Sequence, residues 1–152
     1  MANKFFYGEY EHSLDEKGRV ILPAKFRELL GDRCHITRGY DGCLTVYDDE
    51  GWNKCLEKML ETLEHETDRS HRRLNRSLSA GGVDLNIDKQ GRMLVPPILR
   101  NYAGIDKEVS IIGAVDKIEI WDTGKWQSYI NDPEDTFEDA AEEVEKIRND
   151  SV

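Results

Sequence analysis

The sequence is poor in the features that define several common protein classes. Its 152 residues include only three cysteines, Cys34, Cys43 and Cys55, and these form no Cys-x-x-Cys pair. An odd number of isolated cysteines is typical of a reducing compartment, where thiols serve as small apolar residues. The four histidines have no metal-ligand spacing, and the chain has neither a glycine-rich phosphate loop nor a nucleophile motif. The composition therefore favours a protein that is not an enzyme and needs no cofactor and no metal.

Long apolar runs and a surplus of positive charge are also missing. No apolar run approaches the length of about 18 residues that spans a bilayer, so we expect a cytoplasmic protein with no membrane partner. The formal net charge is −10, which argues at first against nucleic-acid binding. Residues 132–152 hold nine acidic and two basic residues and so carry −7, which leaves −3 for the rest of the chain. A nearly neutral body with local basic clusters can still bind phosphate, because charges interact within a screening length of about 8–10 Å.

The chain does contain one sequence motif that occurs twice. Residues 14–31 read LDEKGRVILPAKFRELLG, and residues 87–104 read IDKQGRMLVPPILRNYAG, 73 residues later. Such a repeat indicates two copies of one supersecondary unit, each presenting the same surface group. The recurring residues are Asp15/Asp88, Gly18/Gly91, Arg19/Arg92, Pro23/Pro96, Arg27/Arg100 and Gly31/Gly104.

Each copy predicts a ββαββ-like unit. A strand at 6–14 or 83–87 leads into a tight β-hairpin turn, in which glycine supplies the positive φ. Proline then ends the next short strand and begins a helix of about eight residues, which a glycine caps. Two more strands complete each copy, at 34–37 and 44–47 in the first and at 109–114 and 118–121 in the second.

Helical periodicity lies outside these units. The linker after the first copy carries an apolar stripe and then four arginines on one helical face. That arginine face has three interpretations: a solvated face, a subunit interface against acids, or a phosphate track. In the acidic tail, Thr136 and Asp139 form a helix-start signal. The charge of the tail alone would allow disorder, and the apolar stripe favours a docked amphipathic helix over it. The stripes comprise Leu56, Met59, Leu60 and Leu63, then Arg69, Arg72, Arg73 and Arg76, then Phe137, Ala140, Ala141, Val144 and Ile147.

Paired Asp-x-x-x-Arg motifs, each followed by a β-run and proline and joined by an arginine-bearing linker, resemble the MraZ family of bacterial transcriptional regulators. The resemblance covers about residues 5–130. It implies a mainly β fold with α helices, in which the tandem repeats form one AbrB-like swapped-hairpin barrel of pseudo-twofold symmetry. The expected organisation is a first repeat at 5–52, a helical linker at 53–80, a second repeat at 81–126 and a helical acidic tail at 127–152.

The resemblance also implies a function. It predicts a cytoplasmic, nucleoid-associated, ring-like homo-oligomer that binds double-stranded DNA at short tandem sites, notably upstream of the division and cell-wall gene cluster. No small-molecule substrate is expected. Two alternatives stay open, namely a non-enzymatic oligomeric scaffold and an RNA- or antitoxin-like binding module.

Basic residues of the two turns are the candidate DNA contacts. Arg19 and Arg92 are the principal candidates for DNA contact, because a guanidinium at a turn edge can bind phosphate or the O6/N7 pair of guanine. Lys17 and Lys89 would add phosphate contacts. The lysine stands one place earlier in the second turn, so the two turns need not contribute equally.

Acidic residues of the turns and arginines of the short helices have expected supporting roles. Asp15 and Asp88 would orient the turns by accepting backbone or arginine N–H groups rather than by touching DNA. The competing interpretation is that aspartate and arginine only staple each turn together. For Arg27 and Arg100, salt bridges to neighbouring acids are at least as strongly expected as DNA contact.

Overall fold

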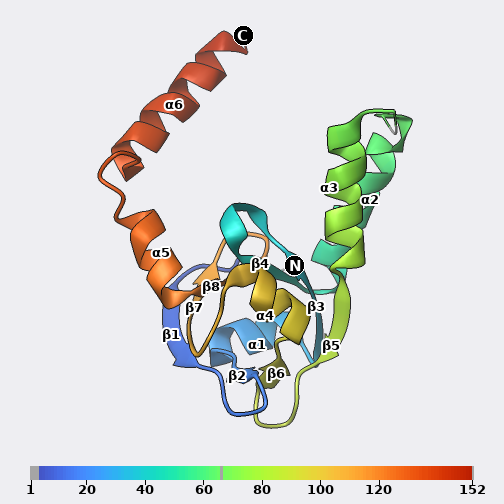
Figure 1. The fold of residues 1–152 in the computed structure, drawn as a ribbon, viewed down its shortest axis with the longest axis vertical. Coiled ribbons are helices and arrows are strands. Elements are labelled where there is room, and N and C mark those ends of the chain that lie inside the picture. The colour runs from blue at the N-terminus through green and yellow to red at the C-terminus, as the bar shows by residue number, and fades with distance from the viewer. Residues whose placement is uncertain (1–3, 66, 152) are drawn as a thin grey trace. The chain divides into compact units, whose positions relative to one another are not determined.

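The computed structural model describes residues 4–65 and 67–151 (Figure 1). These residues divide into two compact units, with the boundary between Asp122 and Thr123. The first unit holds both copies of the repeat and the helical linker. Its elements are β1 (Glu9–Ser13), β2 (Arg19–Ile21), α1 (Ala24–Leu30), β3 (Arg33–Arg38), β4 (Leu44–Tyr47), α2 (Asp49–Glu61), α3 (Arg69–Ala80), β5 (Val83–Asn86), β6 (Arg92–Leu94), α4 (Pro97–Ala103), β7 (Glu108–Gly113) and β8 (Ile118–Asp122), with 3₁₀ turns at Tyr40–Gly42 and Thr62–His65.

The strand order shows the pseudo-twofold relation between the copies. The main sheet runs β1-β7-β8-β4-β3-β5, and β2 and β6 form a separate two-stranded ribbon. Elements β1 to β4 of the first copy correspond to β5 to β8 of the second, so the order reads the same from either end. The pseudo-axis passes between β8 and β4 and between β2 and β6.

The two turns form where the sequence predicts them, but the strands beside each turn do not form a hairpin together. The turn at 15–19 is closed by a hydrogen bond of 2.8 Å from Asp15 N to Arg19 O. Beyond it, β1 pairs with β7 and β2 with β6, while β5 pairs with β3. The expected local hairpin is therefore wrong as a strand pairing, because each strand finds its partner in the other copy. This exchange confirms the AbrB-like swapped-hairpin fold.

A single apolar core joins the two copies. Val20 of β2 and Met93 of β6 are fully buried and face inward, whereas their neighbours Ile21 and Leu94 are exposed. The α1 residue Phe26 is also fully buried and makes edge contacts with the rings of Phe6 and Tyr10, at centroid distances of 5.8 and 5.4 Å. Because both copies supply this core, neither copy has a complete core of its own.

The linker forms the two expected helices. Asp48 begins α2 by accepting the N–H of Gly51 at 2.7 Å, and α3 runs beside α2 as a helical hairpin (Figure 1). No residue of either helix is fully buried, and Leu60 and Leu63 are 64% and 44% exposed. Much of the apolar stripe predicted for this segment therefore lies on the surface.

The second unit consists of α5 (Thr123–Ile130) and α6 (Phe137–Asp150). The predicted start of α6 is confirmed: Thr136 Oγ1 accepts the N–H of Asp139 at 3.1 Å, and Asp139 accepts the N–H of Thr136 at 3.2 Å. Helix α6 belongs to the second unit, and its expected docking stays a prediction. A capping box specifies a helix locally, whereas docking requires a partner surface. Among the described residues, no helix has the length and apolar character needed to cross a bilayer.

Candidate nucleic-acid interface

The turns at 15–19 and 88–92, here called the DxxxR turns, have nearly the same internal geometry. Asp15 Oδ1 accepts the backbone N–H groups of Lys17 and Arg19, both at 2.9 Å, and Oδ2 accepts the Nε–H of Arg19 at 2.8 Å. In the second turn, Asp88 makes the equivalent bonds to the backbone of Gln90 and Arg92 and to Arg92 Nε, at 2.9, 2.8 and 2.7 Å. The aspartates thus bond inward to the turns, as the sequence led us to expect.

These bonds act on the charge of the aspartates. The backbone N–H of Arg19 is the main cause that holds the pKa of Asp15 below its usual value, and the backbone N–H of Arg92 does the same for Asp88. Hydrogen bonds to an ionised carboxylate favour its charged form. Each carboxylate therefore stays negative at neutral pH and holds the adjacent arginine in one orientation.

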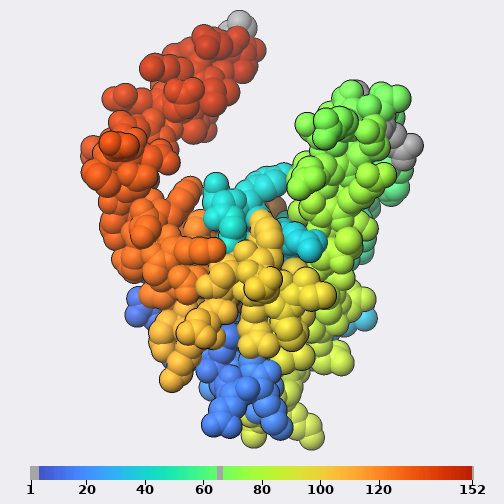
Figure 2. All heavy atoms as spheres, in the orientation of Figure 1, coloured from blue at the N-terminus to red at the C-terminus, as the bar shows by residue number. Residues whose placement is uncertain are grey.

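The strand pairing brings the two arginines onto one surface. Because β2 and β6 are antiparallel, Arg19 lies opposite Leu94 and Ile21 lies opposite Arg92. Side chains alternate along a strand, so these four residues share the outer face of the ribbon, here called the ribbon face. The arginines stand at diagonal positions, typically about 7–8 Å apart. Figures 1 and 2 show the DxxxR turns, in blue and yellow-green, side by side at one end of the first unit.

The ribbon face also contains two residues that the sequence did not single out. Ile21 is 49% exposed and Leu94 is 43% exposed, although both belong to apolar runs. Because side chains alternate between the two faces of a strand, the sequence could have indicated that one residue in each short apolar run is exposed. Exposed aliphatic side chains between two arginines can contact the apolar edges of bases, including the thymine methyl group.

The two lysines occupy different positions in their turns. The backbone N–H of Lys17 bonds to Asp15 Oδ1, and the corresponding bond in the second turn comes from Gln90, not from Lys89. Both lysine side chains are exposed. They therefore add positive charge beside the ribbon face at positions that the pseudo-axis does not relate.

The arginines of the short helices cross to the opposite turn. A Cβ atom added at Gly91 would lie 2.6 Å from the Cζ of Arg27, and one added at Gly18 would lie 2.9 Å from the Cζ of Arg100. The backbone joins the same segments, since Leu22 N donates to Gly91 O at 2.9 Å. The glycines thus provide space as well as a positive φ, which is 80° at Gly18 and 79° at Gly91.

No salt bridge of Arg27 or Arg100 is found among the described residues, so the expected pairing with neighbouring acids is wrong. The Nε atoms of both arginines are buried without a hydrogen-bond partner in that part of the chain. Each guanidinium instead packs against the opposite DxxxR turn. The geometry therefore gathers four arginines and two lysines around the ribbon, in a chain whose net charge is −10.

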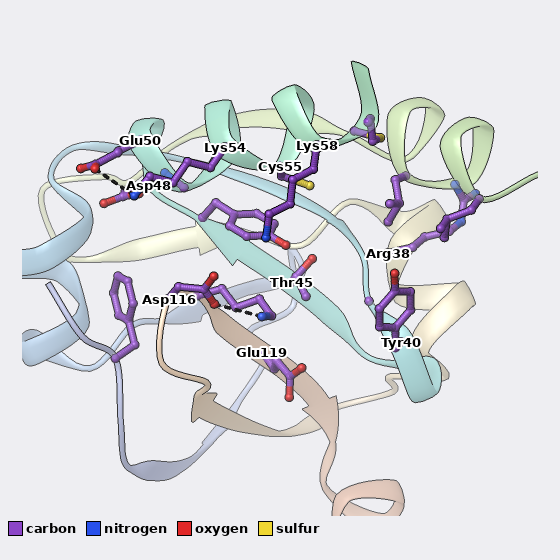
Figure 3. A pocket seen from close by; sticks show the side chains of 18 of the residues that line it. Arg38, Tyr40, Thr45, Asp48, Glu50, Lys54, Cys55, Lys58, Asp116 and Glu119 are labelled. Carbon is purple, nitrogen blue, oxygen red and sulfur yellow. Dashed lines mark hydrogen bonds and ion pairs between the residues drawn. The ribbon is translucent and has the colours of Figure 1, made fainter. Parts of the chain in front are cut away.

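A cavity of about 690 Å³ is the main alternative site. It lies between the α2–α3 hairpin and strands β4 and β8, and Thr45, Cys55 and Glu119 are among its lining residues (Figure 3). Two of its lysines are paired with acids, Lys54 with Glu50 at 3.2 Å and Lys117 with Asp116 at 3.0 Å. The cavity lining therefore mixes basic side chains such as Lys58 with acids such as Glu119, whereas the ribbon face places its arginines beside exposed apolar residues.

Buried thiols also give no sign of an activated nucleophile. Burial raises the pKa of Cys34 to about 12 and also raises that of Cys43. Both thiols are therefore protonated at neutral pH and serve as apolar core residues. Among the described residues, no group of three or more His, Cys, Asp or Glu side chains is placed to hold a metal ion.

The exchanged strands and the paired arginine turns define the class of this chain: it is a tandem, AbrB-like swapped-hairpin protein. A family model described as "MraZ protein, putative antitoxin-like" matches it twice, at residues 5–74 and 78–147. The chain belongs to the MraZ family. The two matches correspond to the two copies of the repeat.

Three relatives are similar in sequence to this protein over almost its whole chain. The "Transcriptional regulator MraZ" of Acetivibrio thermocellus is 48% identical over 139 residues, which cover 91% of this chain and 96% of the relative. Proteins of the same name from Thermoanaerobacter pseudethanolicus and from Thermoanaerobacter sp. (strain X514) are each 46% identical over 140 residues, covering 92% of this chain and 96% of the relative. The similarity therefore spans both repeats and the linker.

Proposed function

We propose that this chain is a sequence-specific DNA-binding transcriptional regulator and that the ribbon face reads the DNA. The observation that carries the proposal is the placement of Arg19 and Arg92 at diagonal positions of one exposed ribbon. The name of the relatives supports the regulatory role, and the family match supports the fold on which it is based. The proposal needs no enzymatic step, cofactor or metal.

Each arginine is prepared to bind before DNA arrives. Its Nε–H is engaged by the aspartate of the same turn, while no hydrogen bond from Nη1 or Nη2 is found among the described residues. The fork of terminal nitrogens can therefore bind two phosphate oxygens or the O6/N7 pair of a guanine. The lysines would add phosphate contacts that position the turns without reading sequence.

A single ribbon offers few contacts, so we infer that affinity comes from several copies acting together. A ring-like homo-oligomer would present the ribbon faces to short tandem sites, and each bound copy would raise the effective concentration of the next. Equivalent sites should then lie about one helical turn of DNA apart. We place such sites upstream of the division and cell-wall gene cluster, which makes the protein cytoplasmic and nucleoid-associated.

A titration of duplex DNA from the region upstream of the chain's own gene tests the proposal. Replacing Arg19 and Arg92 by alanine should cost about 1–3 kcal/mol of binding free energy per arginine if each makes a bidentate contact. The matched control is Lys54→Ala plus Lys58→Ala, which removes two positive charges from α2 and should leave affinity nearly unchanged.

Three results would count against the proposal. They are undiminished binding by the arginine variant, equal losses in the control, and equal affinity for single and tandem sites. Binding by neither the wild type nor the variants would favour the scaffold interpretation. Affinity should also fall steeply with salt, because phosphate contacts release counterions. The oligomer mass must be the same in all variants.

The description of the family model as antitoxin-like favours one second candidate, an RNA- or antitoxin-like binding module on the same barrel. The ribbon could present the same arginines to a structured RNA. Competition between duplex DNA and structured RNA for the wild-type protein separates the two, since DNA should displace RNA if the first proposal holds.

A further inference from the structure

The α2–α3 hairpin carries a strongly basic face. Helix α3 contains four arginines and no acid, and Arg69, Arg73 and Arg76 have no carboxylate partner among the described residues. These arginines and Arg72 are spaced at i, i+3, i+4 and i+7 and so share one side of the helix. We call this the arginine face.

Apolar surface and a hollow accompany the arginine face. The exposed side chains of Leu60 and Leu63 come from α2 and from the turn that follows it. A hollow of about 570 Å³ opens beside Leu63, and its lining residues are Leu63, Arg72, Asn75, Arg76, Ser79 and Ala80. The hairpin thus combines positive charge with uncovered apolar area, which is typical of an interaction surface.

Helix α6 has the complementary character. It contains six acids and two bases and so carries −4, against +4 on α3. Its apolar stripe is uncovered, with Phe137 86%, Val144 46% and Ile147 56% exposed. At 1.5 Å per residue, α6 is about 21 Å long and α3 about 18 Å long, so the helices match in length.

Helical spacing places some of the acids where they can accompany the apolar stripe. At 100° per residue, Glu138 and Glu145 flank the stripe on one side and Glu143 flanks it on the other. Glu142 lies on the opposite face of the helix. A helix whose apolar stripe is bordered by carboxylates fits a surface whose apolar residues are bordered by arginines.

We propose that α6 of one copy docks on the arginine face of a second copy. The occupant is a second copy, because the ring-like oligomer of the proposed function needs a contact that repeats from molecule to molecule.

Such a contact joins two different surfaces, so it is heterologous. Repeated from copy to copy, it generates a ring if the rotation closes. The docking contact would therefore hold together the ring-like oligomer of the proposed function, and it rests on that proposal. It also assigns the arginine face to a neighbouring copy rather than to DNA.

Charge reversal in the full chain tests the contact. One variant carries Arg69→Glu, Arg73→Glu and Arg76→Glu, and the other carries Glu138→Lys, Glu143→Lys and Glu145→Lys. Asp139 is left in place because it belongs to the capping box. By sedimentation without DNA, each variant alone should lose the wild-type assembly, because like charges then face each other across the contact.

An equal mixture of the two variants should regain the assembly. In the mixture, the acidic α6 of the first variant can bind the intact arginine face of the second variant. The lysine-bearing α6 of the second variant can bind the glutamate-bearing face of the first. Both favourable contacts join two different molecules. A contact within one chain would be lost in both variants and would not return on mixing. Two single substitutions at exposed sites form a matched pair. Glu145→Lys should weaken assembly because Glu145 flanks the apolar stripe, and Glu142→Lys should not, because Glu142 lies on the opposite face.

Four results would overturn the inference: a wild type that stays monomeric, reversed variants that keep the wild-type mass, a mixture that does not reassemble, or equal effects of the two single substitutions. The DxxxR turns are intact in every variant, and the mass is measured without DNA. Failure of the docking contact is therefore distinct from failure of DNA reading by the ribbon face.

Discussion

At the residue scale, two positions with the same φ angle require glycine for different physical reasons. Gly42 and Gly91 both have φ of 79°. A Cβ atom at Gly42 would meet nothing within 4 Å, whereas one at Gly91 would collide with the guanidinium of Arg27. The first position needs glycine only for its backbone, and the second also needs space for an arginine from the other copy.

We therefore predict different costs for the same substitution. Gly42→Ala should lower the free energy of unfolding by about 1–2 kcal/mol, the cost of the left-handed conformation. Gly91→Ala should cost more, because Arg27 must also move. Urea unfolding measures both, and Arg27→Ala should reduce the excess in the Gly91→Ala background. Equal losses at the two glycines would contradict this interpretation.

The aspartates of the turns predict a dependence of stability on pH. Their folded pKa values lie below the usual value, so the stability that their ionised forms contribute is present above about pH 3.9 and is lost as the pH falls through the folded pKa. A variant with Asp15→Asn and Asp88→Asn should be less stable than the wild type at pH 7. The difference should shrink as the pH falls below 4, because the wild-type carboxyls then become neutral too.

Urea unfolding at several pH values tests this linkage. A difference between the wild type and the double Asn variant that stays constant from pH 7 to pH 3 would show that the carboxylate charge does not stabilise the turns. Glu16→Gln, which removes the other exposed acid of the first turn, is the matched control and should change stability little at any pH.

At the scale of elements, the ribbon separates a core face from a binding face within three-residue strands. Met93 is fully buried, and the next residue, Leu94, is 43% exposed. We predict that Met93→Ala costs about 2–5 kcal/mol of unfolding free energy. Leu94→Ala should cost about 0.5 kcal/mol or less. Similar costs for both would contradict the alternation.

The same pair should behave in the opposite way toward DNA. Under conditions in which both variants are folded, Leu94→Ala should weaken DNA binding more than Met93→Ala, because only Leu94 lies on the ribbon face. Fluorescence anisotropy with the duplex used for the arginine variants measures this. A larger loss from Met93→Ala in the folded state would argue against the ribbon as the reading surface.

At the scale of the whole molecule, the exchange of strands makes the two copies depend on each other. β1 needs β7, β5 needs β3, and β2 needs β6, so each pairing joins one copy to the other. We predict that a chain cut between Thr67 and Asp68 yields two fragments that purify together when only one carries a tag. Neither fragment alone should give a folded monomer.

Size measurement and far-UV circular dichroism of each fragment check this prediction. An isolated fragment should be unfolded or should pair with a second copy of itself, because a second repeat supplies the missing strands. A folded, monomeric fragment would show that one copy has a sufficient core. Cutting between Ile130 and Asn131, outside the first unit, is the control and should leave residues 1–122 folded.

The sequence by itself determined the local features of this protein. The turns, the short helices after Pro23 and Pro96, the start of α6 and the duplicated arginines depend on residues close together in the chain, so their signals are legible in one copy and repeated in the other. The bonds from each aspartate to its own arginine belong to the same group, because they span only four residues.

Only the tertiary structure decided which strands pair and which surfaces result. The tight hairpin predicted from one repeat was wrong because a strand pairs where it buries most apolar surface. The partner strand lies in the other copy, about 50 to 100 residues away in the sequence. The same exchange exposed Ile21 and Leu94 and placed Arg27 against Gly91. Contacts of this kind depend on three-dimensional packing between distant segments, which no local pattern of residues encodes.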